Sequence, residues 1–224
     1  PDERAGIVGA RDVAMARLTG GHVHIQHVST ANSVEIIRRA KQQGIPVTAE
    51  VTPHHLTLTS DCLKDYDPVY KVAPPLRTLA DVEACRFGLK DGTIDVIASD
   101  HAPQLEEEKE LELASAPCGM IGLETTVGVI STVLVHGGDF SWAQLIPTMT
   151  SLPSDIRKLG RGRLRAGLPG DITVIVTERQ RVVEPVKFHP RSRNCLLWGW
   201  GLRGRAVASV VVGRLVFDPA NAQA

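Results

Sequence analysis

The sequence lacks the features that mark several specialised classes of protein. Lys and Arg number 25, as do Asp and Glu, so the formal net charge is zero and nothing indicates a nucleic-acid surface. No apolar run approaches the roughly 20 residues that a membrane-spanning helix needs. The four cysteines form no Cys-x-x-Cys pair, which gives no sign of a disulfide framework or a structural zinc site. We therefore expect a cytoplasmic protein that binds neither nucleic acid nor membrane.

What is present is an ordinary globular composition. The 224 residues are 43% hydrophobic and 22% charged, which is enough to bury a substantial core. The only dense charge run, at 106–112, is expected to be a solvated loop or helix face. The chain begins Pro-Asp-Glu-Arg, without an initiator Met or a signal-peptide pattern, and we interpret this start as an interior cut.

The first half of the chain alternates between helical and strand patterns. Apolar residues recur at helical spacing in three segments, and short β-branched runs lie between them. Alternation of this kind is typical of parallel βαβ units. The predicted helices cover 4–19, 33–43 and 79–90; the predicted strands cover 22–28, 46–51 and 93–98; a long proline-rich loop with one helical turn covers 53–77.

The pattern changes in the second half. After a polar loop to about residue 122, two further helices are expected, and from Gly167 short β-branched runs are broken by Gly and Pro. This change predicts a small β-domain at 167–224, following a barrel segment at 1–166, and its strands are candidates for pairing with an N-terminal part. The predicted helices are 124–136 and 142–150, and the predicted strands are 172–177, 181–186, 207–212 and 214–217.

Each of the three predicted parallel strands ends in residues that can bind a metal or move a proton. The first strand is followed by His27, the second by Glu50 and a His-His pair, and the third by Asp100. The carboxyl ends of parallel barrel strands meet at one face, where functional residues gather. Because such side chains are costly to bury without a partner or a metal, their clustering favours a metal site.

His27 is a candidate metal ligand, because a neutral imidazole on a rigid strand offers a fixed lone pair. The alternative is a histidine hydrogen-bonded in a strand-end turn, which is the role expected for His22 and His24. Alternation along the strand places His22 and His24 on one face. His27 is set apart from them only if the end of the strand bends. The spacing alone therefore does not choose among the three.

Asp100 directly follows an apolar strand, so its carboxylate could bind a metal and also shuttle a proton to and from bound water. The alternative is that it caps the next turn. His54, His55 and Glu50 could orient a ligand or serve a structural loop role, and none is assigned to the metal. His101 is expected to pack or hydrogen-bond locally.

Two loops are expected near this face. The Pro-Pro segment 71–77 ends in Arg77, which could contact an anionic substrate or pin the loop. Gly119 would let backbone N–H groups approach a ligand closely. Cys118 is not expected to be a nucleophile, because no Lys, Arg or His is adjacent in sequence to lower its pKa. From its residues alone, the chain is predicted to be a partial α/β barrel with a metal site at the strand ends.

Five motifs then add a resemblance, which runs from near the start of the chain to about residue 220. They occur in the same order as in the second half of the bacterial-type dihydroorotases of the amidohydrolase superfamily, which the chain closely resembles. The motifs are HIQHVST at 24–30, VTAEVTPHHL at 47–56, KVAPPLR at 71–77, DGTIDVIASDHAP at 91–103 and APCGMIGLET at 116–125.

The resemblance implies a fold and a metal centre. The fold would be a (β/α)8 TIM barrel, of which this chain holds strands six to eight, followed by the amidohydrolase β-domain. The cofactor would be zinc (Zn2+), one or two ions in the full-length protein. His27 would be the metal-binding histidine of strand six, and Asp100 the metal ligand and catalytic acid–base of strand eight. The family's other metal ligands lie outside this chain.

The resemblance also implies the reaction, which is reversible cyclisation of N-carbamoyl-L-aspartate to L-dihydroorotate in pyrimidine synthesis. Backbone groups at Cys118 and Gly119 would help to bind the substrate. Two further substrate positions depart from the family, which often has Asn at Ala73 and His at Gln104. Gln104 still donates a hydrogen bond but cannot become cationic, which would cost around 1–3 kcal/mol of binding to an anion.

Two other functions compete with an active dihydroorotase. One is a related hydrolase, an allantoinase or dihydropyrimidinase, which Ala73 and Gln104 leave open although the segment 117–125 argues against it. The other is a catalytically silent dihydroorotase-like subunit that scaffolds a partner such as aspartate transcarbamoylase. His27 and Asp100 argue against that. A homodimer is also possible.

Overall fold

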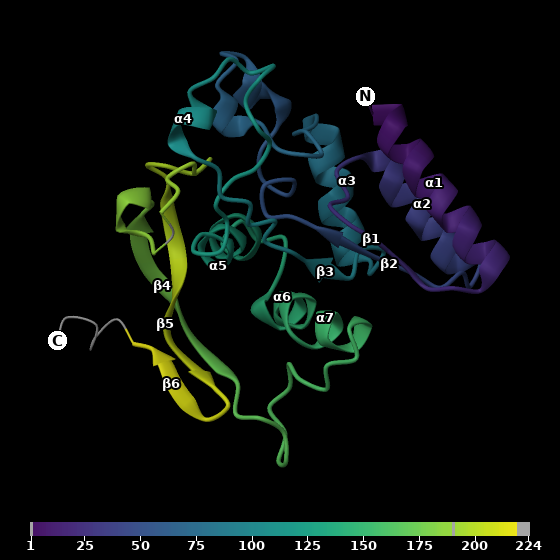
Figure 1. Cartoon of the computed structure of the whole chain (residues 1–224). Coiled ribbons are helices and arrows are strands. Elements are labelled where there is room, and N and C mark those ends of the chain that lie inside the picture. The colour runs from purple at the N-terminus through teal and green to yellow at the C-terminus, as the bar shows by residue number, and fades with distance from the viewer. Residues whose placement is uncertain (1, 190, 219–224) are drawn as a thin grey trace. The chain divides into compact units, whose positions relative to one another are not determined.

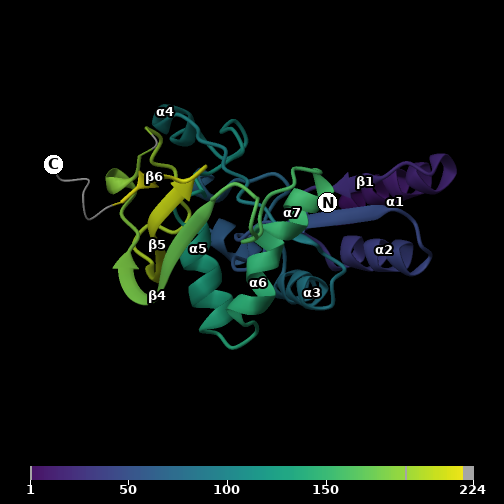
Figure 2. The same ribbon diagram turned by 90° about the horizontal axis from the view of Figure 1, so that it is seen from below.

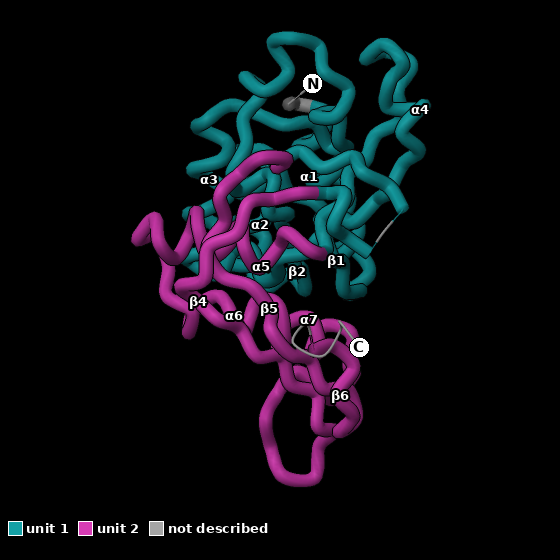
Figure 3. The backbone as a smooth tube through the Cα atoms, turned by 90° about the vertical axis from the view of Figure 1, so that its left-hand side faces the viewer, with its two compact units in different colours: residues 1–123, 185–196 teal, residues 124–184, 197–224 magenta. Residues whose placement is uncertain are grey.

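The computed structural model describes residues 2–189 and 191–218, and the chain divides into two compact units (Figure 3). Unit 1 consists of residues 1–123 and 185–196, and unit 2 consists of residues 124–184 and 197–224. The segment 185–196 thus belongs to unit 1 although its neighbours in sequence on both sides belong to unit 2.

Unit 1 contains a parallel sheet in the order β1-β2-β3 (Figure 1). The strands are β1 (Val23–Ile25), β2 (Val47–Val51) and β3 (Val96–Ile97). Helix α2 (Ala31–Gln42) connects β1 to β2, and α3 (Leu79–Lys90) precedes β3. The α/β class and the parallel strand order predicted from the alternating pattern are therefore confirmed.

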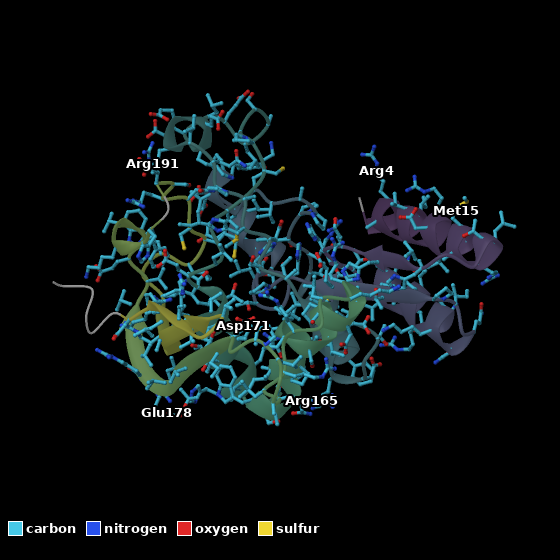
Figure 4. The ribbon with its side chains drawn as sticks, turned by 60° about the horizontal axis from the view of Figure 1, so that its bottom comes forward. Arg4, Met15, Arg165, Asp171, Glu178 and Arg191 are labelled. Atoms are coloured by element: carbon cyan, nitrogen blue, oxygen red, sulfur yellow. The ribbon has the colours of Figure 1, made fainter. Side chains whose placement is uncertain are left out.

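Helix α1 (Asp2–Thr19) packs beside α2, and α2 packs beside α3. The side chain of Thr30 caps α2 by accepting a hydrogen bond from the Ser33 N–H at 3.1 Å, which satisfies one of the free donors at the helix start. The apolar residues of α2 that recur every three positions form a buried face, on which Val34 and Ile37 are only 1% and 0% exposed. The outer face of α1 is exposed, and Met15 projects from it in Figure 4.

Helix α3 approaches α2 and the sheet closely because residue 88 has no side chain. A Cβ atom at Gly88 would lie 2.8 Å from Val34 Cγ1 and 3.3 Å from Ile94 Cδ1. We expect Gly88→Ala to lower the free energy of unfolding by about 1–2 kcal/mol, since overpacking outweighs the gain in helix propensity. Gly9→Ala in α1, where nothing lies within 4 Å, is the control and should raise it by up to about 1 kcal/mol. Urea unfolding of both variants tests this, and equal effects would contradict it.

The first and third strands are shorter than predicted, although the pairing continues past their ends. The Val28 N–H donates to the Glu50 carbonyl at 2.9 Å, and the Ala98 N–H donates to the Val51 carbonyl at 3.0 Å. Beyond these bonds the backbone turns sharply, because Asp100 adopts the left-handed conformation (φ 49°), and His27 does so (φ 54°) just before Val28. The end of the first strand therefore bends, which is the condition under which His27 points away from the side of His22 and His24.

The loops of unit 1 carry short helical turns. The long loop after β2 contains two 3₁₀ turns, η1 (Ser60–Leu63) and η2 (Pro68–Tyr70), where a single helical turn was predicted. The charge run forms the short helix α4 (Glu106–Lys109), consistent with a helix face. Its last residue, Lys109, is buried rather than solvated.

Unit 2 begins with helices. The predicted helix at 124–136 is present as α5 (Thr126–Val129), which continues as the π-helical turn η3 (Ile130–Val135). Helix α6 (Trp142–Met149) matches the second predicted helix, and α7 (Ser151–Ile156) was not predicted.

The rest of unit 2 is an antiparallel sheet in the order β4-β5-β6. The strands are β4 (Ile172–Val182), β5 (Gly201–Val211) and β6 (Arg214–Phe217). The predicted separate strand at 181–186 is wrong, because β4 runs unbroken to Val182 and the 3₁₀ turn η4 (Pro185–Lys187) follows, with a proline that has no N–H to donate to a ladder. Asp171, labelled in Figure 4, stabilises the start of β4 by accepting from the Val212 N–H at 2.7 Å.

The two units do not coincide with the boundary predicted at residues 166/167. Helix α5 packs against β5 (Figure 2), so residues 124–166 cluster with the antiparallel sheet. Gly128 permits this contact, since a Cβ there would lie 3.0 Å from Leu202 Cδ1. The hydroxyl of Thr132 also accepts from the Arg203 N–H at 2.7 Å. In the part of the chain that the structure describes, no helix is both long and apolar enough to cross a membrane.

Candidate functional site

His27 and Asp100 meet at the carboxyl ends of β1 and β3. The Nε2 atom of His27 lies 3.3 Å from Asp100 Oδ1, although 73 positions separate them in sequence. Both residues have left-handed backbone conformations, which are costly for residues other than glycine and often mark functional sites. The structure thus brings together the two side chains that the sequence singled out.

Glu50, near the end of β2, orients His27 from the other side of the ring. One carboxylate oxygen lies 2.9 Å from His27 Nδ1 and the other lies 3.0 Å from His24 Nε2. Burial raises the pKa of Glu50, but the hydrogen bonds with His24 and His27 outweigh burial and lower that pKa to about 2. Glu50 is therefore an ionised acceptor that fixes the ring of His27, with Nε2 turned toward Asp100.

The remaining histidines of the first strand have a different environment. His24 Nδ1 and His22 Nε2 lie 2.8 Å and 3.0 Å from the hydroxyl of Thr48, on the neighbouring strand. Neither ring is paired with Asp100. Of the three histidines, His27 has the left-handed backbone conformation and is the one whose ring lies beside Asp100.

The two carboxylates beside His27 stabilise positive charge on its ring. Hydrogen bonds with Asp100 and Glu50 raise the pKa of His27 to about 9, against the opposing effect of burial. The same negative charges that hold a proton on this ring would attract a divalent metal ion in its place, since metal and proton compete for one nitrogen lone pair.

His54 is buried beside the pair, and its ring makes no hydrogen bond within the part of the chain that the structure describes. It is 3% exposed, and both of its ring nitrogens lack a hydrogen-bond partner among the described residues. Its Nε2 atom lies 3.7 Å from Asp100 Oδ2. Burial, together with the charges of His55 and His27, lowers the pKa of His54 well below its ordinary value, so its ring is neutral. A neutral ring with unused nitrogens next to Asp100 is suited to orienting that carboxylate.

The neighbouring polar residues are held by local bonds. His55 lies 2.7 Å from the Thr52 hydroxyl and 3.0 Å from the Pro74 carbonyl, and burial lowers its pKa to about 4. Arg77 is buried and donates to the Ser29 hydroxyl. Both residues hold the loop at 71–77 in place. These contacts agree with the structural loop role given above as the alternative to ligand or substrate binding.

His101 hydrogen-bonds locally, as predicted. Its Nδ1 atom accepts from the Gly122 N–H at 3.1 Å. His101 thereby connects the end of β3 to the end of the following loop.

The predicted substrate-binding positions gather in one part of unit 1. Gln104 donates from Nε2 to the Cys118 carbonyl at 3.0 Å. Gly119 has φ 132°, and a Cβ there would lie 2.6 Å from the Ala102 carbonyl oxygen, so only glycine fits. The Gly119 N–H donates to the Lys71 carbonyl at 3.0 Å. Ala73, two residues after Lys71, is exposed.

The sequence reasoning missed Asn194. Its amide donates to the Gly119 carbonyl at 2.9 Å, and its oxygen accepts from the Gln104 N–H at 3.4 Å. Asn194 is 4% exposed and comes from the segment 185–196 that returns to unit 1. No local signal could have indicated this role, because the contact spans 75 residues of sequence.

The cavity beside His27 could accommodate a small molecule. It has a volume of about 770 Å³ and is lined by His24, His27, Ser29, Pro74 and Arg77, with Arg4 (Figure 4) and other residues of α1. This volume is in the usual range for ligand pockets.

The donor set fits a zinc ion in part. Imidazole nitrogen and carboxylate oxygen are ordinary zinc ligands, and His27 and Asp100 present one of each. No three His, Cys, Asp or Glu side chains are grouped to hold a metal ion in the residues that the structure describes. A catalytic zinc normally has three protein ligands, so this chain supplies at most part of such a site.

The cysteines should differ sharply in reactivity. Cys85 is fully buried, and burial raises its pKa to about 12, whereas Cys118 is exposed. The thiolate is the reactive form, so at pH 8 iodoacetamide should alkylate Cys118 and leave Cys85 unmodified in the folded chain. Peptide mass spectrometry tests this, with the urea-unfolded chain as the control in which both react. Equal labelling in the folded state would contradict it.

The fold is similar to that of solved cyclic-amide hydrolases. The solved structure of L-hydantoinase (dihydropyrimidinase) from Arthrobacter aurescens superposes with a TM-score of 0.88 and 27% identity, over 95% of this chain and 48% of that one. No family model matches the chain.

Within that class the sequence is similar to the dihydroorotases. It is 47% identical over 218 residues to the dihydroorotase of Pelotomaculum thermopropionicum, across 97% of this chain and 51% of that protein. It is also 47% identical to the dihydroorotase of Streptomyces coelicolor, across 92% of this chain and 48% of that protein. The resemblance predicted from the motifs is thus confirmed, and the chain spans about half the length of the curated relatives it matches.

Proposed function

We propose that the chain forms part of a zinc-dependent dihydroorotase. The observation that carries the proposal is the approach of His27 Nε2 to Asp100 Oδ1, 3.3 Å apart at the carboxyl ends of β1 and β3, the two strands that flank β2. It is supported by 47% identity to dihydroorotases over nearly the whole chain. In this proposal β1, β2 and β3 are strands six to eight of a TIM barrel, and β4–β6 form the small β-domain.

His27 and Asp100 would hold the metal from this chain, and Glu50 would keep the ring of His27 in position. A zinc ion bound there would polarise the amide carbonyl and lower the pKa of a water molecule to about 7. Whether one or two ions bind depends on ligands that this chain does not supply.

Asp100 is the proposed acid–base residue of the ring-opening reaction. In the hydrolytic direction the oxygen of water bonds to the amide carbon, Asp100 accepts the proton of that water, and the ring C–N bond breaks. Asp100 then delivers the proton to the departing nitrogen. The product is N-carbamoyl-L-aspartate, and the reverse sequence closes the ring.

Gln104, Cys118, Gly119 and Ala73 are the proposed substrate-binding positions. Gln104 is hydrogen-bonded to the Cys118 carbonyl, and Gly119 lies in close contact with the backbone of Ala102. The Gln104 amide and the Cys118 N–H would donate hydrogen bonds to the polar edge of the substrate, and Gly119 would let the substrate approach the backbone closely.

A second candidate is a hydantoinase- or dihydropyrimidinase-like hydrolase, which the structural similarity to the Arthrobacter enzyme favours. Sequence identity is higher to the dihydroorotases, at 47% against 27%. Two further proposals concern partners: the chain could belong to a catalytically silent subunit that scaffolds aspartate transcarbamoylase, or to a homodimer.

The experiment compares the 224 residues alone with the complete gene product that contains them. Each is assayed with dihydroorotate, allantoin and dihydrouracil, and its zinc content is measured. We expect the complete protein to hydrolyse dihydroorotate in preference to the other two, and the 224 residues alone neither to hold zinc tightly nor to turn over. Activity only on dihydrouracil or allantoin would favour the second candidate, and robust activity of the 224 residues alone would contradict the partial-site proposal.

A further inference from the structure

Two lysines join the loops that carry the proposed substrate positions. Lys109, the last residue of α4, is 6% exposed. Its ammonium group donates to the Pro68 carbonyl at 2.9 Å, to the Lys71 carbonyl at 3.2 Å and to the Pro117 carbonyl at 3.0 Å. All three N–H donors of the ammonium are therefore used.

Lys71 makes the reciprocal connection. Its ammonium group extends from the first residue of the Pro-Pro segment 71–77 to the loop after α4. There it donates to the carbonyls of Leu113, Ala114 and Ala116, at 2.7 Å, 3.1 Å and 2.6 Å. Each lysine thus extends from one loop and binds main-chain carbonyls of the other, and Lys109 also binds the Pro117 carbonyl of its own loop.

The acceptors that the structure gives for both ammonium groups are main-chain carbonyls. Burial lowers the pKa of Lys109, so the folded protein pays a desolvation cost for this charge. A lysine whose ammonium group lay in solvent would not have this desolvation cost. Removing either ammonium would break three hydrogen bonds to main-chain carbonyls, although the Pro68 and Lys71 carbonyls would still accept from the N–H groups of Lys71 and Gly119.

The connected segments lead directly to the proposed substrate positions. Pro117, whose carbonyl accepts from Lys109, precedes Cys118 and Gly119. The Lys71 carbonyl accepts from the Gly119 N–H, and Ala73 follows two residues later. The conformation of both sides of the subsite therefore depends on the same two ammonium groups.

We propose that Lys71 and Lys109 are positioning residues that hold the loops 66–73 and 105–119 in the arrangement that binds substrate. The proposal deepens the proposed function and rests on it for the identity of the substrate. The two lysines act through the backbone at Cys118 and Gly119 and take no part in proton transfer at Asp100.

The first test needs no activity. Hydrogen exchange followed by mass spectrometry is measured on the 224-residue chain with Lys71→Met or Lys109→Met. The control is Lys41→Met, which removes an ammonium that bonds the Gly92 carbonyl and Asp95 elsewhere in unit 1. We expect exchange in peptides covering 113–121 to become about ten- to a hundredfold faster in the first two variants only. Exchange in peptides from β2 and α3 should stay the same in Lys71→Met and Lys109→Met.

The second test uses the complete gene product and dihydroorotate. Lys71→Met and Lys109→Met should raise KM about tenfold or more, with kcat changed less than about threefold, because uniform binding is lost while the reacting groups stay in place. Lys109→Arg, which keeps the charge and several donors, should recover part of the loss.

The outcomes separate the two proposals. Unchanged exchange at 113–121 in both Met variants overturns the positioning role, whatever the activity. If one variant fails to fold, as shown by circular dichroism, the other variant decides. A fall in kcat at constant KM also overturns the role. Faster exchange at 113–121 in the Met variants of the 224-residue chain, together with a complete gene product that does not hydrolyse dihydroorotate, supports the positioning role and contradicts the proposed function.

Discussion

Replacing Asp100 with asparagine should reduce hydrolysis of dihydroorotate by the complete gene product by about a thousandfold or more, since acid–base groups contribute about 10²–10⁴-fold and a metal ligand is weakened as well. Asparagine keeps the size of the side chain and tolerates the left-handed backbone found at this position. The loss should appear mainly in kcat. Steady-state kinetics with dihydroorotate provide the measurement.

The matched control for this variant is Asp155→Asn. Asp155 is a surface carboxylate paired with Arg163, in unit 2 and outside the proposed site. Its replacement should leave kcat within about twofold, because exposed ion pairs contribute little. If Asp100→Asn retained more than about a tenth of the activity, the role assigned to Asp100 would be wrong.

Replacing Glu50 with glutamine should weaken zinc binding by the complete gene product about ten- to a hundredfold, which is the usual effect of removing the partner that orients a metal-binding histidine. Glu50 lies 2.9 Å from His27 Nδ1, and a glutamine would fill the same space without the negative charge. Competition with a chelator measures zinc affinity directly and does not depend on turnover.

Glu35→Gln is the control for Glu50. Glu35 is paired with Arg38 and Arg39 on the exposed side of α2 and touches none of the site residues. Zinc affinity should be unchanged in that variant. An unchanged affinity in Glu50→Gln as well would show that His27 does not depend on Glu50 for its orientation, or that His27 is not a ligand.

The sequence predicted much of unit 1 because its signals are local. Helices α2 and α3 have capping residues and regular apolar spacing, and β2 is a short buried run, so periodicity alone located them. The strand-end positions of His27 and Asp100 followed from the general rule for parallel strands. Their approach to within 3.3 Å is a tertiary fact that this rule anticipated.

What the sequence could not predict depends on contacts between distant segments. Asn194 reaches Gly119 only because residues 185–196 return to unit 1, and no periodic pattern records that path. Lys109 lies in a run of glutamates that resembles a solvated surface, yet its ammonium is buried against loop carbonyls. The extent of β4 was also missed, since strand boundaries depend on pairing with β5 rather than on composition.

The return of residues 185–196 to unit 1 has a consequence for dissecting the protein. The chain passes from one unit to the other at 123/124, 184/185 and 196/197, so no single cut yields both units intact. A polypeptide shortened to end before residue 185 would keep most of the first unit but lose the amide that braces Gly119 and Gln104. Truncation should therefore impair ligand recognition even where every residue proposed to face the ligand is retained.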